Sequence, residues 1–176
     1  EVSSHALTLG RVDGTSFEIG AFTNLSQDHL DFHADMGEYF EAKRSLFDRC
    51  RIGVAWVDDP AGAVIADEAS IPIVRVGEGP DADVRGVAVA IKIDGTTFDA
   101  TGPDGGARIH LRLPGRHNMS NALVAAACAN SLGIPWDTIA DGIARVAAIP
   151  GRFEIVPTVS AATVVVDYAH TPAGIE

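Results

Sequence analysis

The feature that most constrains this chain is a dense polar stretch, residues 23–33, that directly follows an apolar run, residues 17–22. The run contains Phe, Ile and Ala and has the length of one strand. The polar stretch gathers carboxylates, hydroxyls and two histidines. In α/β proteins, ligands collect at the carboxyl ends of strands. The sequence therefore predicts an α/β fold with a ligand site in residues 23–33.

The spacing inside this stretch is compatible with three interpretations. His29 and His33 lie four residues apart, and a helix would place both on one face. The neighbouring acids Asp28, Asp31 and Asp35 would complete a zinc site. The chain lacks a paired-cysteine signature, however, and carboxylate, hydroxyl and phosphate oxygens suit magnesium better. The remaining interpretation is a solvated polar turn in which an Asp or Ser caps a short helix.

Composition limits the classes of partner. The chain has 176 residues, 47% of them hydrophobic, which is enough for one core of ordinary size. Its formal charge is −11, which argues against nonspecific binding of nucleic acids or anionic membranes. A phosphorylated ligand would need a local positive site or a metal.

The cysteines and the longest apolar segment bear on the compartment. Cys50 and Cys128 are far apart and form no motif. Isolated cysteines are typical of a reducing compartment, so we expect two buried thiols. The longest apolar segment, residues 122–129, is too short to cross a bilayer, so no membrane insertion is expected.

Hydrophobic periodicity and turn residues divide the chain into elements. A short helix is expected to run to Leu9, capped by Ser3 or Ser4 and ended by Gly10. Further helices are expected at residues 36–49, 61–69, 122–132 and 135–146. Strands are expected at residues 17–22, 52–57, 71–76 and 162–166. A small antiparallel meander without catalytic residues is expected from the alternating segments 84–93, 96–100 and 107–113.

Two more polar clusters stand beside these elements. Residues 113–121 lead into the alanine-rich helix, for which Asn118 or Ser120 is the expected cap. Residues 167–172 follow the last strand, so they again lie at the carboxyl end of a strand. Arg11 follows the first helix, where its guanidinium is placed to bind a phosphate or carboxylate.

Lys43 lies on the expected helix at residues 36–49. It is three or four residues from Tyr39, Phe40 and Phe47, which with Leu46 form the apolar face of that helix. Lys43 is therefore expected to be partly buried. Its ordinary interpretation is a solvated side chain whose aliphatic stem packs on that face.

Six motifs, in this order, resemble one family, the bacterial Mur ligases. They are Glu-Val-Ser-Ser-His (1–5), Thr-Asn-Leu-Ser-x-Asp-His-Leu-Asp-Phe-His (23–33), Glu-Ala-Lys (41–43), Gly-Arg-His-Asn-x-x-Asn-Ala (115–122), Pro-Gly-Arg-Phe-Glu (150–154) and Val-Asp-Tyr-Ala-His-Thr-Pro (166–172). The resemblance covers essentially the whole chain. It is greatest to the type that adds the third residue of the peptidoglycan stem peptide.

The resemblance implies a domain organisation. Mur ligases have a UDP-sugar domain, a central P-loop-type ATPase domain and a third domain for the incoming amino acid. Residues 1–150 resemble the C-terminal part of the central domain, with the meander at about 84–113. Residues 151–176 resemble the linker and the start of the third domain. The family's Gly-Lys-Thr phosphate loop would precede Glu1, so we expect a piece of a longer chain that is inactive by itself.

The resemblance also implies a magnesium site. Glu1 and His29 match the family's metal ligands, and a neutral imidazole can fill one octahedral position although magnesium prefers oxygen. Lys43 matches a lysine that is carbamylated in the family. The carbamate turns a cation into a carboxylate-bearing group that helps to hold a second magnesium ion. His29 and Lys43 are thus the expected catalytic residues.

Further matches concern the substrates. Ser3 and Arg11 match positions that contact the UDP-muramoyl peptide, whereas Leu9 departs from a glutamine found in some relatives. Tyr168 and His170 match the hinge between domains. The positions that match ATP contacts are Asn118, Asn121 beside the adenine, Arg152 beside the phosphates and Asp167 beside the ribose.

The implied activity is ATP-dependent amide ligation in peptidoglycan synthesis. The implied partners are ATP, UDP-MurNAc-L-Ala-D-Glu and a diamino acid, either meso-diaminopimelate or L-lysine, with Mg²⁺ as cofactor and an acyl phosphate as intermediate. We expect a cytoplasmic monomer in the full-length form, without nucleic-acid partners. Two alternatives are a folylpolyglutamate or cyanophycin synthetase and a noncatalytic nucleotide-binding module. The Ser-Ser-His and Asp-Tyr-Ala-His segments argue against the first alternative.

Overall fold

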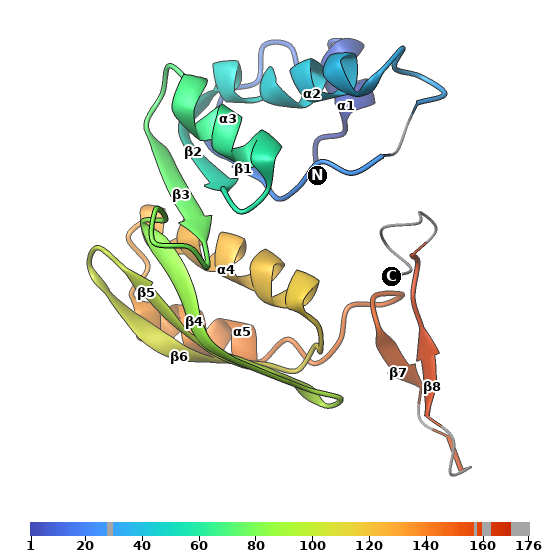
Figure 1. The fold of residues 1–176 in the computed structure, drawn as a ribbon, viewed down its shortest axis with the longest axis vertical. Coiled ribbons are helices and arrows are strands. Elements are labelled where there is room, and N and C mark those ends of the chain that lie inside the picture. The colour runs from blue at the N-terminus through green and yellow to red at the C-terminus, as the bar shows by residue number, and fades with distance from the viewer. Residues whose placement is uncertain (28–29, 157, 160–162, 170–176) are drawn as a thin grey trace.

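The computed structural model describes residues 1–27, 30–156, 158–159 and 163–169. Its centre is a six-stranded sheet in the order β1-β2-β3-β4-β5-β6 (Figure 1). The strands are β1 (Phe17–Phe22), β2 (Cys50–Trp56), β3 (Ile73–Gly77), β4 (Val84–Lys92), β5 (Gly95–Gly102) and β6 (Gly105–Leu111). Strands β1 to β4 run parallel, and β5 and β6 are each antiparallel to the preceding strand. The predicted α/β fold is confirmed.

The expected meander forms as β4, β5 and β6. It extends the parallel sheet, because β4 pairs in parallel with β3 and aligns Val84 with Val76. A register shift between Val87 and Ala90 marks a β-bulge in β4. The meander and the parallel strands therefore share one continuous hydrogen-bonded sheet.

Helices cover both faces of the six-stranded sheet. On one face lie α3 (Pro60–Glu68) and the 3-10 turn η1 (Phe47–Arg49), and on the other lie α4 (Arg116–Ser131) and α5 (Trp136–Ala144). The alternation of side chains along β2 explains this arrangement. Val54 and Trp56 join the core beneath α4, whereas Ala55 packs with Ile65 of α3. Burial on both faces is the reason that residues 52–57 form a continuous apolar run.

Helix α4 starts earlier than the sequence predicted. It begins at Arg116 instead of residue 122, and the backbone N–H of Met119 already donates to Gly115 O at 3.1 Å. Gly115 is the N-cap, with a φ of 103°, which favours glycine. The prediction that Asn118 or Ser120 caps the helix is wrong, because both lie inside its first turns. The side chains of Arg116, His117, Ser120 and Asn121 therefore project from the start of a helix, whereas Asn118 and Met119 are buried.

Helix α2 (Met36–Arg44) is shorter than predicted. The expected helix at residues 36–49 ends at Arg44, where Ser45 Oγ donates to Ala42 O at 2.8 Å. The 3-10 turn η1 follows, and it places Phe47 in the core just before β2 begins. The expected apolar face is divided as a result: Phe40 and Phe47 pack near α3, whereas Tyr39 packs on His33.

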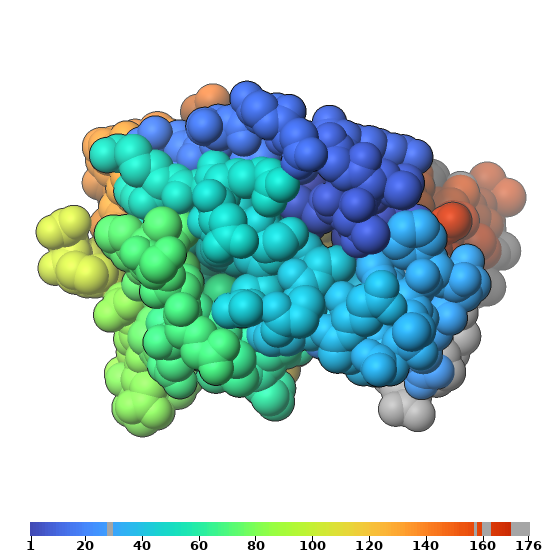
Figure 2. Space-filling view, turned by 90° about the horizontal axis from the view of Figure 1, so that it is seen from above, coloured from blue at the N-terminus to red at the C-terminus, as the bar shows by residue number. Residues whose placement is uncertain are grey.

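The N-terminal helix α1 (Ser4–Thr8) forms as predicted. Ser3 Oγ accepts the N–H of Ala6 at 3.2 Å, and Gly10 ends the helix with a φ of 65°. Figure 2 shows the N-terminal segment, in dark blue, directly beside the light-blue surface of α2. The segments that carry Ser3 and Lys43 are thus neighbours in space.

The last described strands form a separate two-stranded antiparallel sheet, β7 (Glu154–Val156) and β8 (Val164–Val166). Strand β8 confirms the core of the expected strand at 162–166. Of the two cysteines, Cys50 is buried as predicted, but Cys128 is only half-buried. No helix among the described residues has the length and apolar character needed to cross a membrane.

Candidate functional site

Polar residues gather where the parallel strands β1, β2 and β3 end. Because these strands are adjacent and parallel, their carboxyl ends lie at one edge of the sheet. An open pocket of about 340 Å³ lies there. It is lined by Thr23, Asn24, Trp56, Asp58, Asp59, Pro60, His117, Ser120 and Asn121. The first two residues of the polar stretch, Thr23 and Asn24, thus line a pocket, and the ligand site predicted for residues 23–33 stays a prediction.

Asp59 connects two walls of this pocket. Its Oδ1 accepts the N–H of Ala61 at 2.8 Å and thereby caps α3. Its Oδ2 accepts the N–H of Leu25 at 3.1 Å. One carboxylate therefore fixes the loop after β1 to the start of α3, and it holds Asn24 in the pocket wall.

A second set of bonds holds the start of α4 at the same edge. Asp58 Oδ2 accepts the N–H of Glu78, which follows β3, at 2.8 Å. The Glu78 carboxylate in turn accepts hydrogen bonds from the guanidinium of Arg116 and raises its pKa. The first residue of α4 is thereby attached to the ends of β2 and β3.

The first turns of α4 form one wall of the pocket. His117, Ser120 and Asn121 have helical i, i+3 and i+4 spacing, so they share one face. Unpaired N–H groups and the helix dipole favour negative charge at such an N-terminus. The pocket therefore combines the N-terminus of a helix and hydrogen-bonding side chains with two carboxylates, Asp58 and Asp59.

Of the two asparagines predicted to contact ATP, one lines the pocket and the other does not. Asn121 is exposed and lines the pocket. Asn118 is buried, and its Nδ2 donates to Pro114 O at 2.7 Å, so its amide supports the turn before α4. It is absent from the pocket lining, and its contact with ATP stays a prediction.

Asp167 follows β8, and its carboxylate accepts backbone hydrogen bonds from residues near Arg152 and from the chain just after it. Its two oxygens accept the N–H groups of Phe153 at 2.6 Å and Ala169 at 2.7 Å. These bonds, and the positive charges of Arg152 and His117, lower the pKa of Asp167. The guanidinium of Arg152 lies 5.8 Å from the centre of the Tyr168 ring. His170 lies outside the described residues.

The charge of His117 is among the causes of that pKa shift, and His117 also lines the pocket. Asp167 is therefore within electrostatic range of the pocket wall. Asp167 is absent from the pocket lining, and its place beside a nucleotide with Asn121 stays a prediction.

The predicted substrate residues flank α1. The Ser3 hydroxyl accepts a helix-capping bond, which is the structural role that the sequence also allowed. Arg11 is exposed beyond the end of α1. Neither residue lines the pocket at the carboxyl edge, so they mark a second, adjoining region of the molecule.

Lys43 has the environment that its spacing predicted. It is half-buried on α2, and its Nζ lies 5.0 Å from the centre of the Tyr39 ring. The partial burial beside Tyr39 is confirmed. The carbamate itself stays a prediction.

Of the predicted magnesium ligands, the structure describes Glu1 and Lys43 but not His29. Glu1 is exposed, and His29 and Asp28 lie outside the described residues. Among the residues that are described, no three His, Cys, Asp or Glu side chains form a metal cluster. Residues 30–35 form turns and bends instead of a helix, and His33 bonds to Ser4. The helical geometry that the zinc interpretation required is therefore missing at these positions.

Among the polar residues of the pocket, Asp58, Asp59 and His117 were not singled out from the sequence. The two acids directly follow the predicted strand at 52–57, so the strand-end rule was sufficient to find them. His117 belongs to the predicted polar cluster at 113–121. Its position became clear only because α4 starts at Arg116.

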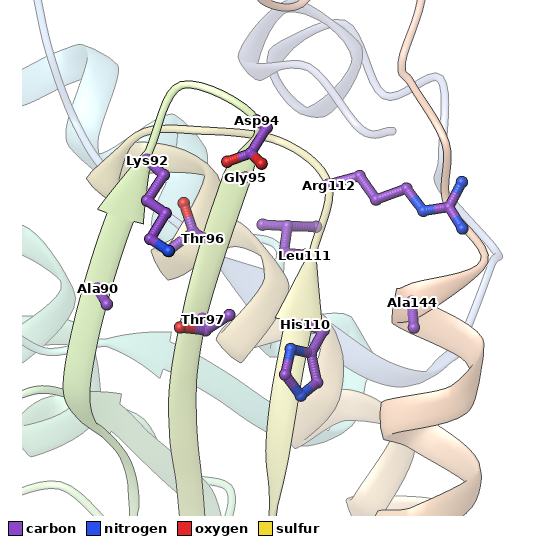
Figure 3. Close-up of a pocket in the computed structure, with 10 residues that line it drawn as sticks. All are labelled: Ala90, Lys92, Asp94, Gly95, Thr96, Thr97, His110, Leu111, Arg112 and Ala144. Carbon is purple, nitrogen blue, oxygen red and sulfur yellow. The ribbon is translucent and has the colours of Figure 1, made fainter.

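A second pocket, of about 370 Å³, lies on the meander, away from the predicted site residues (Figure 3). Its lining includes three basic side chains, Lys92, His110 and Arg112, and also the acid Asp94. None of the six family-like motifs contributes to it.

Comparisons with known proteins identify relatives along the whole chain. A UDP-N-acetylmuramoyl-L-alanyl-D-glutamate–2,6-diaminopimelate ligase of Geobacter metallireducens is 44% identical over 185 residues, which cover 100% of this chain and 36% of that protein. The Streptomyces coelicolor protein of the same name is 44% identical over 182 residues, with the same coverage. A solved structure of a ligase with this name matches with a TM-score of 0.82 and 29% identity, over 98% of this chain and 37% of that one.

The chain thus spans little more than a third of the length of these relatives. The family described as the Mur ligase middle domain matches residues 1–129, which include the sheet, the pocket and Lys43. This match covers well over half of the chain, and the chain therefore belongs to the Mur ligase family.

Proposed function

We propose that this chain is the ATP-binding segment of a ligase that joins 2,6-diaminopimelate to UDP-N-acetylmuramoyl-L-alanyl-D-glutamate in peptidoglycan synthesis. The observation that carries this proposal is the 44% identity, over the entire chain, to ligases of that name. Residues 1–150 would be the later part of the central domain, and residues 151–176 the linker and the start of the next domain. The diaminopimelate in the relatives' names favours this amino acid over lysine.

The geometry supports a nucleotide at the carboxyl edge of the sheet. The pocket there has the N-terminus of α4 as one wall, and Asn121 and His117 project into it. We assign the adenine to Asn121, the ribose to Asp167 and the phosphates to Arg152.

The proposed reaction has two steps. A carboxylate oxygen of the UDP-linked dipeptide attacks the γ-phosphorus of ATP, the bond to the β-phosphate oxygen breaks, and ADP leaves. An acyl phosphate remains. The neutral amino group of diaminopimelate then attacks the acyl carbon, the C–O bond to phosphate breaks, and the nitrogen loses a proton. Arg152 would reduce the repulsion between the two anions in the first step.

The chemistry of the proposed donors fits magnesium. Glu1 and a carbamate on Lys43 offer hard oxygen ligands, and His29 would supply one nitrogen. Lys43 is half-buried beside Tyr39, so the proposed carbamate would occupy a partly desolvated position. When bound, magnesium would neutralise phosphate charge. On the substrate side, Ser3 and Arg11 would bind the UDP-muramoyl peptide.

The test is ADP release by the full-length ligase. We expect release to require both UDP-MurNAc-L-Ala-D-Glu and diaminopimelate, with lysine much poorer. Release that instead requires a folate and glutamate would assign the chain to another ligase of the superfamily. Nucleotide binding without turnover under every substrate combination would favour a noncatalytic module. Size-exclusion chromatography of the same preparation tests the proposed monomer, and cell fractionation tests the proposed cytoplasmic location.

A further inference from the structure

His33 and Ser4 share a buried hydrogen bond between two segments of the chain. His33 Nε2 lies 2.9 Å from Ser4 Oγ, and the two residues are 29 positions apart. The exposed fractions are 1% for His33 and 2% for Ser4. A hydrogen bond so shielded from water fixes the relative position of its two segments more firmly than an exposed one.

The ring of His33 also contacts Tyr39, whose ring lies next to Lys43. It stacks on Tyr39 with the ring centres 5.1 Å apart and the planes tilted by 23°. Tyr39 is buried, and Lys43 Nζ lies 5.0 Å from the centre of its ring. Phe32 meets the His33 ring edge-on at 4.9 Å. A continuous series of contacts therefore runs from α1 through His33 and Tyr39 to Lys43.

The use of histidine at this position needs an explanation. Among the described residues, His33 Nδ1 is buried and has no hydrogen-bond partner. An unpaired buried nitrogen is unfavourable, and a phenylalanine ring would fill similar space without that cost. The feature that phenylalanine lacks is the Nε2 bond to Ser4. The structure therefore points to this bond as the reason for a histidine.

Both segments that meet at His33 carry residues of the proposed reaction. Helix α1 follows Ser3 and precedes Arg11, the proposed contacts to the UDP-muramoyl peptide. Helix α2 carries Lys43, the proposed carbamate. The carboxylate that is to be phosphorylated must be held in a fixed position relative to the carbamate, because small displacements of reacting groups lower the rate.

We infer that His33 is a positioning residue, which holds the peptide-binding helix α1 in register with Lys43 through its bond to Ser4 and its stack on Tyr39. This inference rests on the proposed function and extends it to residues that touch neither substrate. It concerns the binding of one substrate, the UDP-linked dipeptide, and leaves the nucleotide pocket at the carboxyl edge unaffected.

Four variants of the full-length ligase test the inference. His33→Phe keeps the ring but removes the bond, and Ser4→Ala removes the bond from the other side. The double variant removes both polar partners together. His33→Gln restores an amide near the position of Nε2. His110→Phe is the matched control, because His110 is exposed on β6, far from the proposed site residues.

We expect the two single variants to raise the KM for UDP-MurNAc-L-Ala-D-Glu about tenfold and to change the KM for ATP less than about twofold. The double variant should be no worse than either single one, because both act on the same bond. His33→Gln should recover part of the loss. The control should have wild-type constants.

An unchanged KM for the UDP-linked dipeptide in both single variants would overturn the inference. So would an equal rise of both KM values, since the effect would then not be specific to the UDP-linked dipeptide. If a single variant fails to fold, the double variant still supplies a protein without the bond and without its unpaired partner. Failure of the proposed function is distinguishable, because it would appear as a wild-type enzyme that forms no product.

Discussion

The backbone N–H of Leu25 donates to Asp59 Oδ2 at 3.1 Å, although the two residues are 34 positions apart. The bond joins the loop after β1 to the residue that caps α3 after β2. Adjacent parallel strands bring these two segments to the same edge of the sheet. The polar stretch and the pocket wall are therefore organised by one carboxylate.

Removing this carboxylate should destabilise the fold. We expect Asp59→Ala to lower the free energy of unfolding by about 1–2 kcal/mol, because it removes the α3 cap and the bond to Leu25. Asp59→Asn keeps one acceptor oxygen and should lose less. Urea unfolding followed by tryptophan fluorescence measures both. Equal stability of Asp59→Ala and the wild type would show that the cap contributes nothing.

Residues 1–176 by themselves should not turn over ATP. The sequence contains no Gly-Lys-Thr or Gly-Lys-Ser phosphate loop, whose backbone and lysine hold the β- and γ-phosphates in P-loop enzymes. A coupled assay for ADP on the purified chain should give only background. The full-length ligase is the positive control. Substrate-dependent turnover by the 176-residue chain would contradict this prediction.

Lys43 tests the proposed carbamate. Lys43→Ala in the full-length ligase should lose most activity, and added short carboxylic acids should restore part of it by supplying the missing anion. Lys43→Arg should stay inactive, because it keeps a positive charge where a negative one is needed. Wild-type turnover by Lys43→Arg would leave Lys43 as an ordinary helix lysine. Carbon-13 NMR with labelled bicarbonate detects the carbamate directly.

The proposed metal ligands should alter the magnesium requirement. Glu1→Ala and His29→Ala in the full-length ligase should each raise the Mg²⁺ concentration needed for half-maximal activity and lower kcat, since each removes one ligand. Circular dichroism should show an intact fold. Exposed Glu18 on β1 offers a matched control as Glu18→Ala, with wild-type magnesium dependence. An unchanged requirement in both test variants would reject the assignment.

The Asp167 carboxyl should titrate below its ordinary pKa of 3.8. The N–H groups of Phe153 and Ala169 bond to the charged form, so the folded-state pKa is lowered. The resulting stabilisation of the turn is fully present above about pH 3.8 and is lost as the pH falls through the lower, folded-state pKa. NMR titration of the carboxyl carbon measures this. A pKa at or above 3.8 would show that the two bonds are absent in solution.

The local elements of this chain were largely predictable because their signals are local. The strand at 17–22 and the cap at Ser3 follow from periodicity and hydrogen-bonding chemistry within a few residues. The predicted helix boundaries were wrong where residues outside the local pattern determine the start or end of the helix. Gly115 starts α4 early, and the need to place Phe47 in the core ends α2 at Arg44.

The sequence by itself determined the α/β class, the polar clusters and the partial burial of Lys43, because each depends on residue type and short-range spacing. Only the tertiary structure decided which clusters meet. Asp59 bonds to Leu25, and His33 to Ser4, across separations that no periodic pattern encodes. These pairs form because parallel strand order and helix packing bring distant segments side by side, where polar groups shielded from water must find partners.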